Sequence, residues 1–216
     1  DELAVLSHQR ALAAIQAGKF QEEIVPMEVK SRKALLTVDT DEHPRETTLE
    51  ELSRLKPAFQ EGGVVTAGNA SGMNDAACAM VIASAERAKD LGLTPLAVLR
   101  ATATVGVPPE IMGVGPIYSV PKALELAGLR QEDMAYFELN EAFAAQFLAC
   151  QRTLGLDMEK VNRNGSGISL GHPVGCTGLR IVMETILELR RQGQSLGCAS
   201  LCVGGGPSMA AIVEAL

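Results

Sequence analysis

Three short motifs in the second half of the chain carry side chains that could do chemistry. Asn140 lies in Asn-Glu-Ala-Phe (140–143), His172 in Gly-His-Pro (171–173) and Cys202 in Cys-Val-Gly-Gly-Gly (202–206). An imidazole exchanges protons near neutral pH, a thiol can act as acid, base or nucleophile, and an amide can hold a water or a substrate oxygen. Each motif is expected where a strand meets a turn, so the three together indicate acid/base chemistry.

Each of these residues also has a purely structural explanation. Asn140 and Glu141 by themselves are better explained as the cap and the first-turn residue of a following helix, because Asn is a favoured cap and a carboxylate suits a helix N-terminus. Phe143 would then be a core residue. Cys202 ends an apolar strand, where a cysteine is more often packing than catalytic, although the glycines after it expose amides that could stabilise a thiolate or an oxyanion.

The loop around His172 is the more suggestive signal. Five glycines occur in the fifteen residues 164–178. Such a run costs stability, which favours a functional loop over an incidental surface turn. The spacing of the glycines does not match a dinucleotide-binding fingerprint, and no Lys-Ser or Lys-Thr follows them, so a P-loop is not indicated either.

The five cysteines indicate free thiols rather than disulfides or a metal site. They form no Cys-x-x-Cys pair and have no metal-ligand spacing with the three histidines, so zinc is not expected. An odd number in a chain of this size fits a reducing compartment. We interpret Cys78, Cys150 and Cys198 as core residues and Cys176 as a neighbour of the site.

The composition predicts an ordered chain with an aliphatic core. Of the 216 residues, 47% are hydrophobic and only 3% aromatic. The formal net charge of −7 argues against nonspecific binding to nucleic acid, and an anionic ligand would need a local basic pocket. No apolar run is long enough to cross a bilayer. Because the chain begins at Asp1 with no initiator Met, we treat it as a segment, and the lack of a targeting signal is weak evidence.

The first 92 residues predict a helix, a polar excursion and a buried element. Residues 1–17 are rich in Ala and Leu and end at a glycine, which is typical of a helix. Residues 19–66 are the most polar part and indicate a path over a surface. Residues 75–83 are nearly all apolar and favour a buried helix or a buried strand. A short helix over 84–92 follows, with Ser84 as its cap.

Strand and helix signals alternate through the rest of the chain. The predicted strands are 96–105, 134–139, 196–203 and 208–213, and the predicted helices are 119–128, 141–154 and 176–191. This order implies an α/β sandwich with helices over a mixed sheet, whose last two strands are antiparallel around the turn 204–207.

Taken together and in order, the three motifs resemble the C-terminal half of thiolases, the family of acetyl-CoA acetyltransferases and 3-ketoacyl-CoA thiolases. The stretches 64–72 and 111–116 also match that pattern, so the resemblance runs through the whole chain. One departure lies in the His loop, where the family more usually has Gly-Gly-Ala and this chain has Gly165-Ser166-Gly167. The additional hydroxyl could alter hydrogen bonding in the loop, which bears on chain-length preference rather than on activity.

The resemblance implies a thiolase-like layered α/β sandwich with a mixed five-stranded sheet, in a subunit about twice as long as this chain. Residues 1–70 would be the remainder of an inserted loop domain, 71–93 the closing elements of the N-terminal half, and 94–216 the C-terminal half. The family's nucleophilic cysteine would lie upstream of Asp1, so this segment alone would lack part of its active site.

By the same resemblance, the enzyme would make or cleave the carbon–carbon bond of a 3-ketoacyl-CoA through an acyl-enzyme on that cysteine. His172 would activate the nucleophile and, with a water held by Asn140, donate hydrogen bonds to a thioester oxygen, while Cys202 would exchange a proton with the substrate carbon or the departing thiol. The Gly204 amide would belong to a second oxyanion hole. The implied substrate contacts are Ser71 and Ala67 along the pantetheine tunnel, Met112 and Phe143 in its apolar lining, and Arg45 at the nucleotide end.

The family also implies CoA as substrate or product, no cofactor, no metal, and a homodimer or homotetramer in which the missing N-terminal half of the same subunit is a partner. We expect no nucleic acid and no membrane span, and a cytoplasmic location, with organellar targeting left open. Two alternatives remain. A ketoacyl synthase of the same fold is expected to have a second His where Asn140 stands and to lack the Cys202 base, and a thiolase-like subunit could bind lipid or CoA without catalysis.

Overall fold

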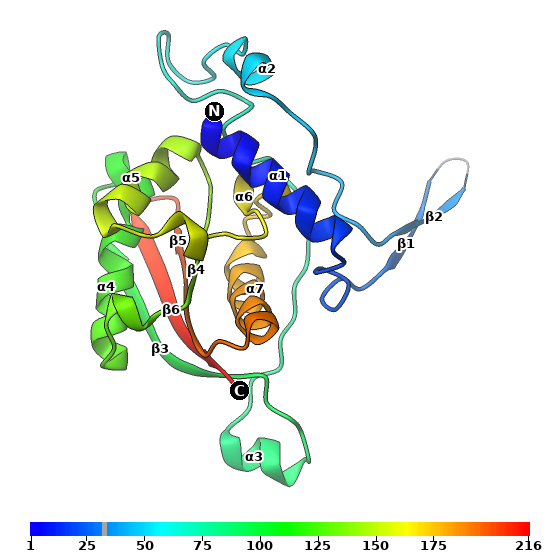
Figure 1. The fold of residues 1–216 in the computed structure, drawn as a ribbon, viewed down its shortest axis with the longest axis vertical. Helices are drawn as coiled ribbons and strands as arrows, with labels where there is room; N and C mark the ends of the chain where they lie inside the picture. Colours follow the sequence, from blue (N-terminus) through cyan, green and yellow to red (C-terminus); the bar gives the residue numbers. More distant parts are fainter. Residues whose placement is uncertain (32–33) are drawn as a thin grey trace.

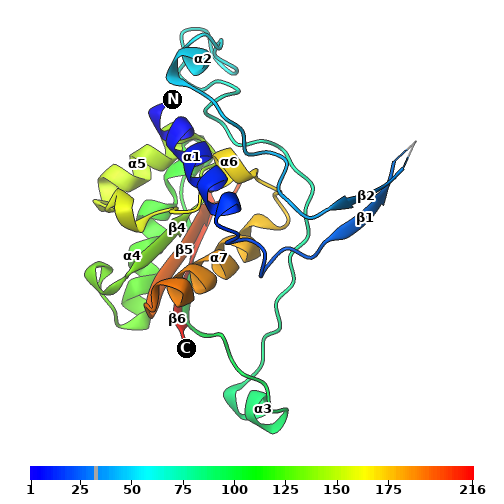
Figure 2. The same ribbon diagram turned by 45° about the vertical axis from the view of Figure 1, so that its right-hand side comes forward.

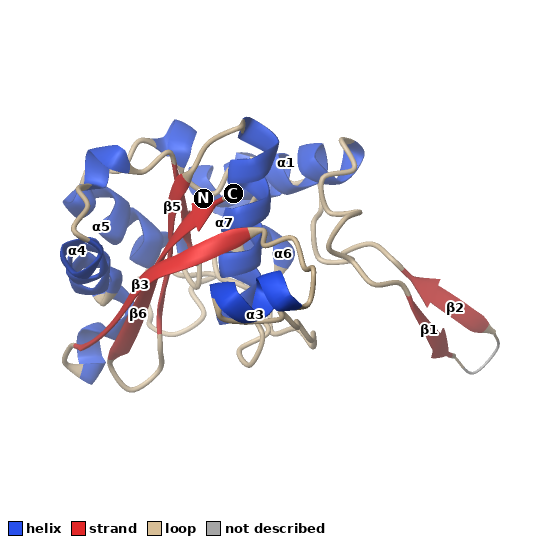
Figure 3. Cartoon of the chain, turned by 90° about the horizontal axis from the view of Figure 1, so that it is seen from below, coloured by secondary structure: helices blue, strands red, loops and turns tan. Residues whose placement is uncertain are grey.

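A computed structural model of the chain describes residues 1–31 and 34–216, and its centre is a four-stranded mixed sheet (Figures 1 and 3). The strands are β3 (Ala97–Gly106), β4 (Tyr136–Leu139), β5 (Leu196–Cys202) and β6 (Pro207–Ala215), in the order β3-β6-β5-β4. β4 and β5 are parallel, and the other two pairs are antiparallel. The prediction of a mixed sheet whose last two strands are antiparallel is confirmed.

Helices cover both faces of this sheet (Figures 1 and 2). α4 (Pro116–Ala127) and α5 (Ala144–Leu154) lie on one side, whereas α7 (Thr177–Gln192), the short α6 (Gly167–Leu170) and α1 (Glu2–Gln16) lie on the other. α7 packs on β4, β5 and β6, and α1 packs on α6. The layered α/β sandwich is therefore confirmed.

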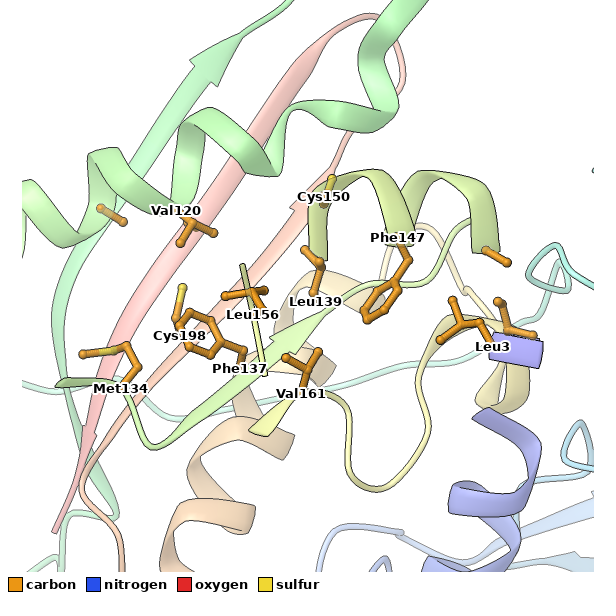
Figure 4. Packing of buried hydrophobic residues seen from close by; sticks show 14 of the residues in the cluster. Leu3, Val120, Met134, Phe137, Leu139, Phe147, Cys150, Leu156, Val161 and Cys198 are labelled. Atoms are coloured by element: carbon orange, nitrogen blue, oxygen red, sulfur yellow. The ribbon is translucent and has the colours of Figure 1, made fainter. Parts of the chain in front are cut away.

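The largest core cluster fills the space between the sheet and helices α4 and α5 (Figure 4). Phe137, Leu139 and Cys198 point into it from β4 and β5, and they meet Val120 from α4 and Phe147 from α5. Burying a large apolar side chain stabilises the fold by about 1.5–3 kcal/mol relative to leaving it exposed. The aliphatic core and the interpretation of Cys198 as a core residue are confirmed.

Among residues 1–31 and 34–216, the sheet has four strands where five were expected. Beside β4, Val161 makes a single parallel bridge with Phe137. A 3₁₀ turn, η3 (Met158–Lys160), precedes this bridge, and Asn162 follows it with a φ of 47°. A left-handed residue directly after the bridge turns the backbone out of the extended conformation, so the fifth strand is reduced to this one pair.

Two helices begin at residues other than those predicted. α4 begins at Pro116, three residues earlier, because proline is favoured in the first turn of a helix. α5 begins at Ala144, with Phe143 as its N-cap residue. Asn140 is therefore not a helix cap, and Glu141 is not in a first helical turn but is buried in the loop before α5. Apart from the element expected over residues 75–83, the other predicted strands and helices lie within two residues of their predicted ends.

Residues 75–83 form neither of the buried elements predicted for this part of the chain. They contain no helix or strand, and Val81 and Ile82 are 86% and 81% exposed. Cys78, interpreted as a core residue, is only half-buried here, so that interpretation is wrong. An apolar segment becomes a buried strand only when another strand and another surface cover it, and the described residues provide no strand alongside this one.

The remaining elements are small and peripheral. They are the hairpin strands β1 (Met27–Lys30) and β2 (Leu35–Val38), the helices α2 (Leu49–Ser53) and α3 (Ala85–Asp90), and the 3₁₀ helices η1 (Pro109–Val114) and η2 (Gln131–Asp133). The hairpin projects from the body of the molecule (Figure 2). Ser84 caps α3, as predicted, by accepting a hydrogen bond from Arg87 N. In the described ranges, no helix is both long and apolar enough to span a membrane.

Candidate active site

Asn140 and His172 meet at the carboxyl end of β4. Asn140 directly follows this strand, is fully buried, and donates its backbone N–H to Ser200 O of β5 at 3.0 Å. Its side-chain Nδ2 lies 3.4 Å from His172 Nε2. The prediction of a strand end is confirmed for Asn140 but wrong for His172, which lies in the loop between α6 and α7. The structure nevertheless brings the predicted amide and imidazole into contact.

Two glycines of the His loop allow this close approach. A Cβ atom at Gly167 would lie 2.7 Å from Asn140 Oδ1, and one at Gly171 would lie 2.2 Å from Asn74 Oδ1. Gly171 also has a φ of 90°, which L residues rarely adopt. His172 N then donates to Gly72 O at 3.0 Å. The glycine content of the loop thus has a steric cause, because in this backbone arrangement a side chain at Gly167 would press on Asn140 and one at Gly171 would press on Asn74.

The first residue of α7 holds the imidazole from the other side. Thr177 Oγ1 donates to Pro173 O at 3.0 Å and lies 2.7 Å from His172 Nδ1. A hydroxyl has a single proton, so with that proton on the carbonyl the ring must donate from Nδ1. His172 Nε2 then carries the lone pair and accepts from Asn140 Nδ2. These contacts select the tautomer in which Nε2 can take up a proton.

The surroundings of His172 keep it neutral at pH 7. Burial lowers the pKa of the imidazole below its usual 6.5, and the nearby positive charge of Arg180 on α7 lowers this pKa further. A general base must be unprotonated to act, so a lowered pKa extends the pH range in which this residue can accept a proton.

Cys202 lies at the same edge of the sheet. It is the last residue of β5, as predicted, and it is 5% exposed. Because β4 and β5 are parallel, with Leu139 opposite Ser200, the strand that ends at Cys202 ends beside Asn140. Burial raises the pKa of the Cys202 thiol, and a hydrogen bond with its own backbone opposes the rise. The thiol is therefore protonated at neutral pH and suited to giving a proton.

The turn after Cys202 leaves Gly204 exposed. Two hydrogen bonds close this turn, from Val203 N to Pro207 O at 2.8 Å and from Gly206 N to Val203 O at 3.2 Å. Gly205 and Gly206 have φ values of 91° and 112°, so glycine is required there by backbone conformation. An exposed amide after a buried thiol fits an oxyanion donor, and this role of Gly204 stays a prediction.

Two of the predicted substrate contacts lie together beside the site. Ser71 N donates to Ala142 O at 2.9 Å, and Ala70 forms a bridge with Phe143. The Phe143 ring packs edge-on against Phe59, with the ring centroids 5.9 Å apart. The segment that contains Ser71 therefore joins the Asn140 motif to the His loop.

The other three predicted substrate contacts lie apart from this group. Ala67 is exposed, Met112 is half-buried in η1, and Arg45 is exposed beside α1, where its backbone N–H donates to His8 Nδ1 at 3.3 Å. Within the described residues, no hydrogen bond joins any of the three to the Asn140–His172 pair. Their roles in substrate binding stay predictions.

Sequence analysis missed Thr177 and Arg180, the two α7 residues that act on the imidazole. Thr177 lies five residues after His172, so a hydroxyl just past the predicted base was the available signal. Arg180 follows Thr177 at a spacing of three, which places both on one face of a helix. That spacing becomes informative only once the start of α7 is known.

We expect Thr177→Val to loosen the choice of His172 tautomer. Valine has a similar shape but no acceptor, so the Nδ1–H would lose its partner, at a cost of about 1–3 kcal/mol. Nitrogen-15 NMR of the 216-residue chain should show mainly Nδ1-protonated His172 in the parent and more of the Nε2-protonated form in the variant. Thr185→Val is the matched control, because Thr185 is buried in the same helix and donates to Ile181 O at 2.7 Å. An unchanged tautomer in Thr177→Val would contradict the assignment.

The layered fold, the Asn140–His172 contact and the thiol at the end of β5 together define a thiolase domain. The family model described as "Thiolase, C-terminal domain" matches residues 93–215, and the one described as "Thiolase, N-terminal domain" matches residues 1–86. The chain therefore belongs to the thiolase family.

Relatives with curated names agree with this assignment. The chain is 49% identical over its whole length to the acetyl-CoA acetyltransferases of Syntrophomonas wolfei and Escherichia coli. It is 46% identical over 99% of its length to the 3-ketoacyl-CoA thiolase of Bacillus subtilis. It covers 55%, 55% and 57% of these three proteins, so it spans about half the length of the curated relatives it matches.

Solved structures show the same fold. The Bacillus anthracis acetyl-CoA acetyltransferase matches with a TM-score of 0.97 at 51% identity, and the human mitochondrial 3-ketoacyl-CoA thiolase with a TM-score of 0.97 at 46% identity. Each match covers 100% of this chain and 55% of the solved one. The whole chain thus has the same fold as the matching part of these longer subunits.

Proposed function

We propose that this chain is the C-terminal part of an acetyl-CoA C-acyltransferase that makes or cleaves the carbon–carbon bond of 3-ketoacyl-CoA, with its nucleophilic cysteine in an upstream part of the subunit. The observation that carries the proposal is the contact of Asn140 with the unprotonated Nε2 of His172. It lies at the sheet edge where the Cys202 strand ends. Family membership and the names of the relatives support the same activity.

In the first half of thiolysis, His172 Nε2 takes the proton of the upstream cysteine. The resulting thiolate attacks the C3 carbonyl of the 3-ketoacyl-CoA, and the bond between C2 and C3 breaks. The electron pair stays with C2 as the enolate of acetyl-CoA. Cys202 gives its thiol proton to C2, and acetyl-CoA leaves while the acyl group remains on the upstream cysteine.

In the second half, CoA releases the acyl group. The Cys202 thiolate takes the proton of the CoA thiol, and the CoA sulfur attacks the acyl-enzyme carbonyl to form the shortened acyl-CoA. The upstream cysteine leaves as a thiolate and takes back its proton from His172. Synthesis is the reverse of these steps. CoA is substrate and product, and no separate cofactor takes part.

The backbone amide of Gly204 and the water held by Asn140 would stabilise the oxyanions of these steps. Hydrogen-bond donors aimed at developing negative charge lower a barrier most in a water-excluded site, and Asn140 is fully buried. Ser71, Ala67, Met112, Phe143 and Arg45 would hold the acyl-CoA.

An upstream half of the subunit would complete this site. The exposed apolar segment 75–83 supports this part of the proposal, because Val81 and Ile82 are more than four-fifths exposed yet lie in a chain that aligns throughout with longer subunits. Large apolar side chains grouped at a surface mark a place where another surface packs. Completed subunits would form homodimers or homotetramers, as the resemblance implies.

The activity test uses an assembled enzyme, which here means this chain joined to the part that its relatives carry upstream, for example that of the Escherichia coli relative. We expect the assembled enzyme to consume acetoacetyl-CoA only when CoA is supplied, and the 216-residue chain alone to consume none. The complete relative serves as the positive control. An assembled enzyme that is folded and binds CoA but leaves acetoacetyl-CoA unchanged would contradict the proposal and favour a noncatalytic CoA-binding subunit.

A further inference from the structure

One face of β4 is polar although the strand is buried on both sides. Side chains alternate along a strand, and Phe137 and Leu139 point into the main core. Tyr136, Glu138 and Asn140 therefore share the opposite face, where Tyr136 packs among residues of α7 such as Ile186 and Leu189. Tyr136 and Glu138 are both 0% exposed. A carboxyl group in such a place is costly unless its oxygens are hydrogen-bonded.

The Glu138 carboxyl joins β4 to the His loop. Tyr136 Oη donates to Glu138 Oε2 at 2.6 Å, and Ser166 Oγ donates to Glu138 Oε1 at 2.8 Å. Burial raises the pKa of Glu138 to about 8, with Arg180 opposing the rise and Glu184 adding to it. A neutral carboxyl group keeps one donor and one acceptor, so both hydroxyl groups remain hydrogen-bonded in either protonation state.

Ser166 is the residue of the His loop that hydrogen-bonds to Glu138 of β4. It is the N-cap residue of α6, and its carbonyl accepts from Ser169 N at 3.1 Å and Leu170 N at 2.7 Å. The next residue is Gly167, whose backbone packs directly on Asn140. A shift of Ser166 would therefore move the backbone that touches Asn140 and, through the short α6, the residue that carries the imidazole.

We propose that Glu138 is a positioning residue for the Asn140–His172 pair and that it acts through Ser166. Glu138 precedes Asn140 by two residues in the chain. Its carboxyl group also accepts a hydrogen bond from Ser166, at the start of the loop that carries His172. Its oxygens accept from Tyr136 and Ser166, and no hydrogen bond among the described residues joins them to Asn140 or His172. The expected effect of Glu138 on turnover rests on the proposed function, whereas its effect on the position of the loop does not. The Ser166 hydroxyl, a departure from the usual family sequence, thus has a partner that sequence analysis did not identify.

The first test uses the 216-residue chain and follows the His172 pKa by NMR. Burial is the main cause of its low value, and Arg180 is the charged group that adds to it. A loosened loop would admit water, so Ser166→Ala and Glu138→Leu, which each remove a hydrogen-bonding group of the linkage, should both raise this pKa toward 6.5. Tyr136→Phe is the matched control, because it removes one buried hydroxyl from the same carboxyl group without releasing the loop.

The expected result is a similar fall in the thermal midpoint for Ser166→Ala and Tyr136→Phe, with a raised His172 pKa in Ser166→Ala and Glu138→Leu but not in Tyr136→Phe. Equal pKa values in all variants, or an equal rise in Ser166→Ala and Tyr136→Phe, would overturn the proposal. If Ser166→Ala does not fold, Glu138→Leu, which has a similar side-chain volume but no hydrogen-bonding group, decides by the same comparison. The result does not depend on catalysis, so it stands even where the proposed function fails.

The second test measures turnover in the assembled enzyme. Displacing a catalytic pair without removing it lowers kcat, and we expect Ser166→Ala to lower kcat for acetoacetyl-CoA by about 10- to 100-fold with little change in KM. The double variant Glu138→Leu/Ser166→Ala should lose no more than the larger single loss, because both changes break one linkage. Additive losses, or a loss confined to KM, would contradict a positioning role.

Discussion

Replacing Cys202 with alanine should lower thiolysis by the assembled enzyme about 10²–10⁴-fold while acyl-enzyme formation survives. A positioned acid or base contributes a factor of this size. Cys202 protonates the leaving enolate and deprotonates the incoming CoA in the mechanism above, whereas the upstream cysteine and His172 form the acyl-enzyme. The alanine variant should therefore accumulate labelled acyl-enzyme from acetyl-CoA and release it slowly. Mass spectrometry of the quenched protein measures the label directly.

Cys198→Ala is the matched control for this experiment. Cys198 lies on the same strand and is 1% exposed, but its side chain points into the core cluster between the sheet and helices α4 and α5. Burial raises the pKa of Cys198 to about 12, so it is a poor acid. The control should lose some stability and keep its turnover. Full turnover in Cys202→Ala, or equal loss in both variants, would remove Cys202 from the mechanism.

The sequence was most informative where local pattern and tertiary structure agree. The apolar runs before Asn140 and Cys202 are strands, and both residues lie at the strand ends where turn residues interrupt the pattern. Parallel pairing of these strands then brings the two ends to one edge. The glycines around His172 indicated a functional loop because a run of glycines lowers the stability of the folded chain. The close packing of Gly167 on Asn140 explains why glycine is nevertheless used there.

The start of α5 could not be predicted because distant residues decide it. Glu141 has the right position for a first helical turn, but its carboxyl group accepts from Ser7 Oγ at 2.6 Å and from Asn162 Nδ2 at 3.0 Å. Burial raises the pKa of Glu141, and these two hydrogen bonds oppose the rise. The backbone leaves the helical conformation to place Glu141 among partners that lie 134 and 21 residues away in sequence. Helix propensity describes single residues within a helix and does not include contacts with residues so far away in sequence.

The wrong prediction for residues 75–83 has a different cause. The segment has the composition of a buried strand, but burial depends on what covers a segment and not on its own sequence.

Thr177 was missed for a related reason. A threonine at the start of a helix is ordinary, and its effect on His172 depends on the direction of one hydroxyl proton toward Pro173 O.

His172→Ala should abolish acyl-enzyme formation itself, which separates it from Cys202→Ala. Without the imidazole, the upstream thiol has no base to take its proton, and we expect a loss of about 10²–10⁴-fold in the rate of labelling. The parent rate should persist as the pH falls to 6.5 and decline below it. A protonated imidazole cannot accept a proton, and burial together with Arg180 places the His172 pKa below 6.5.

His43→Gln tests whether the loss belongs to the chemistry of His172 or to the packing of its loop. His43 is also half-buried, its ring lies against Gly72, whose carbonyl accepts from His172 N, and burial and Arg45 lower its pKa as well. It has no contact with Asn140 among the described hydrogen bonds, so the variant should form acyl-enzyme at close to the parent rate. If His43→Gln loses labelling as fully as His172→Ala, the defect lies in the loop, and the role of His172 as the base that activates the upstream cysteine is wrong.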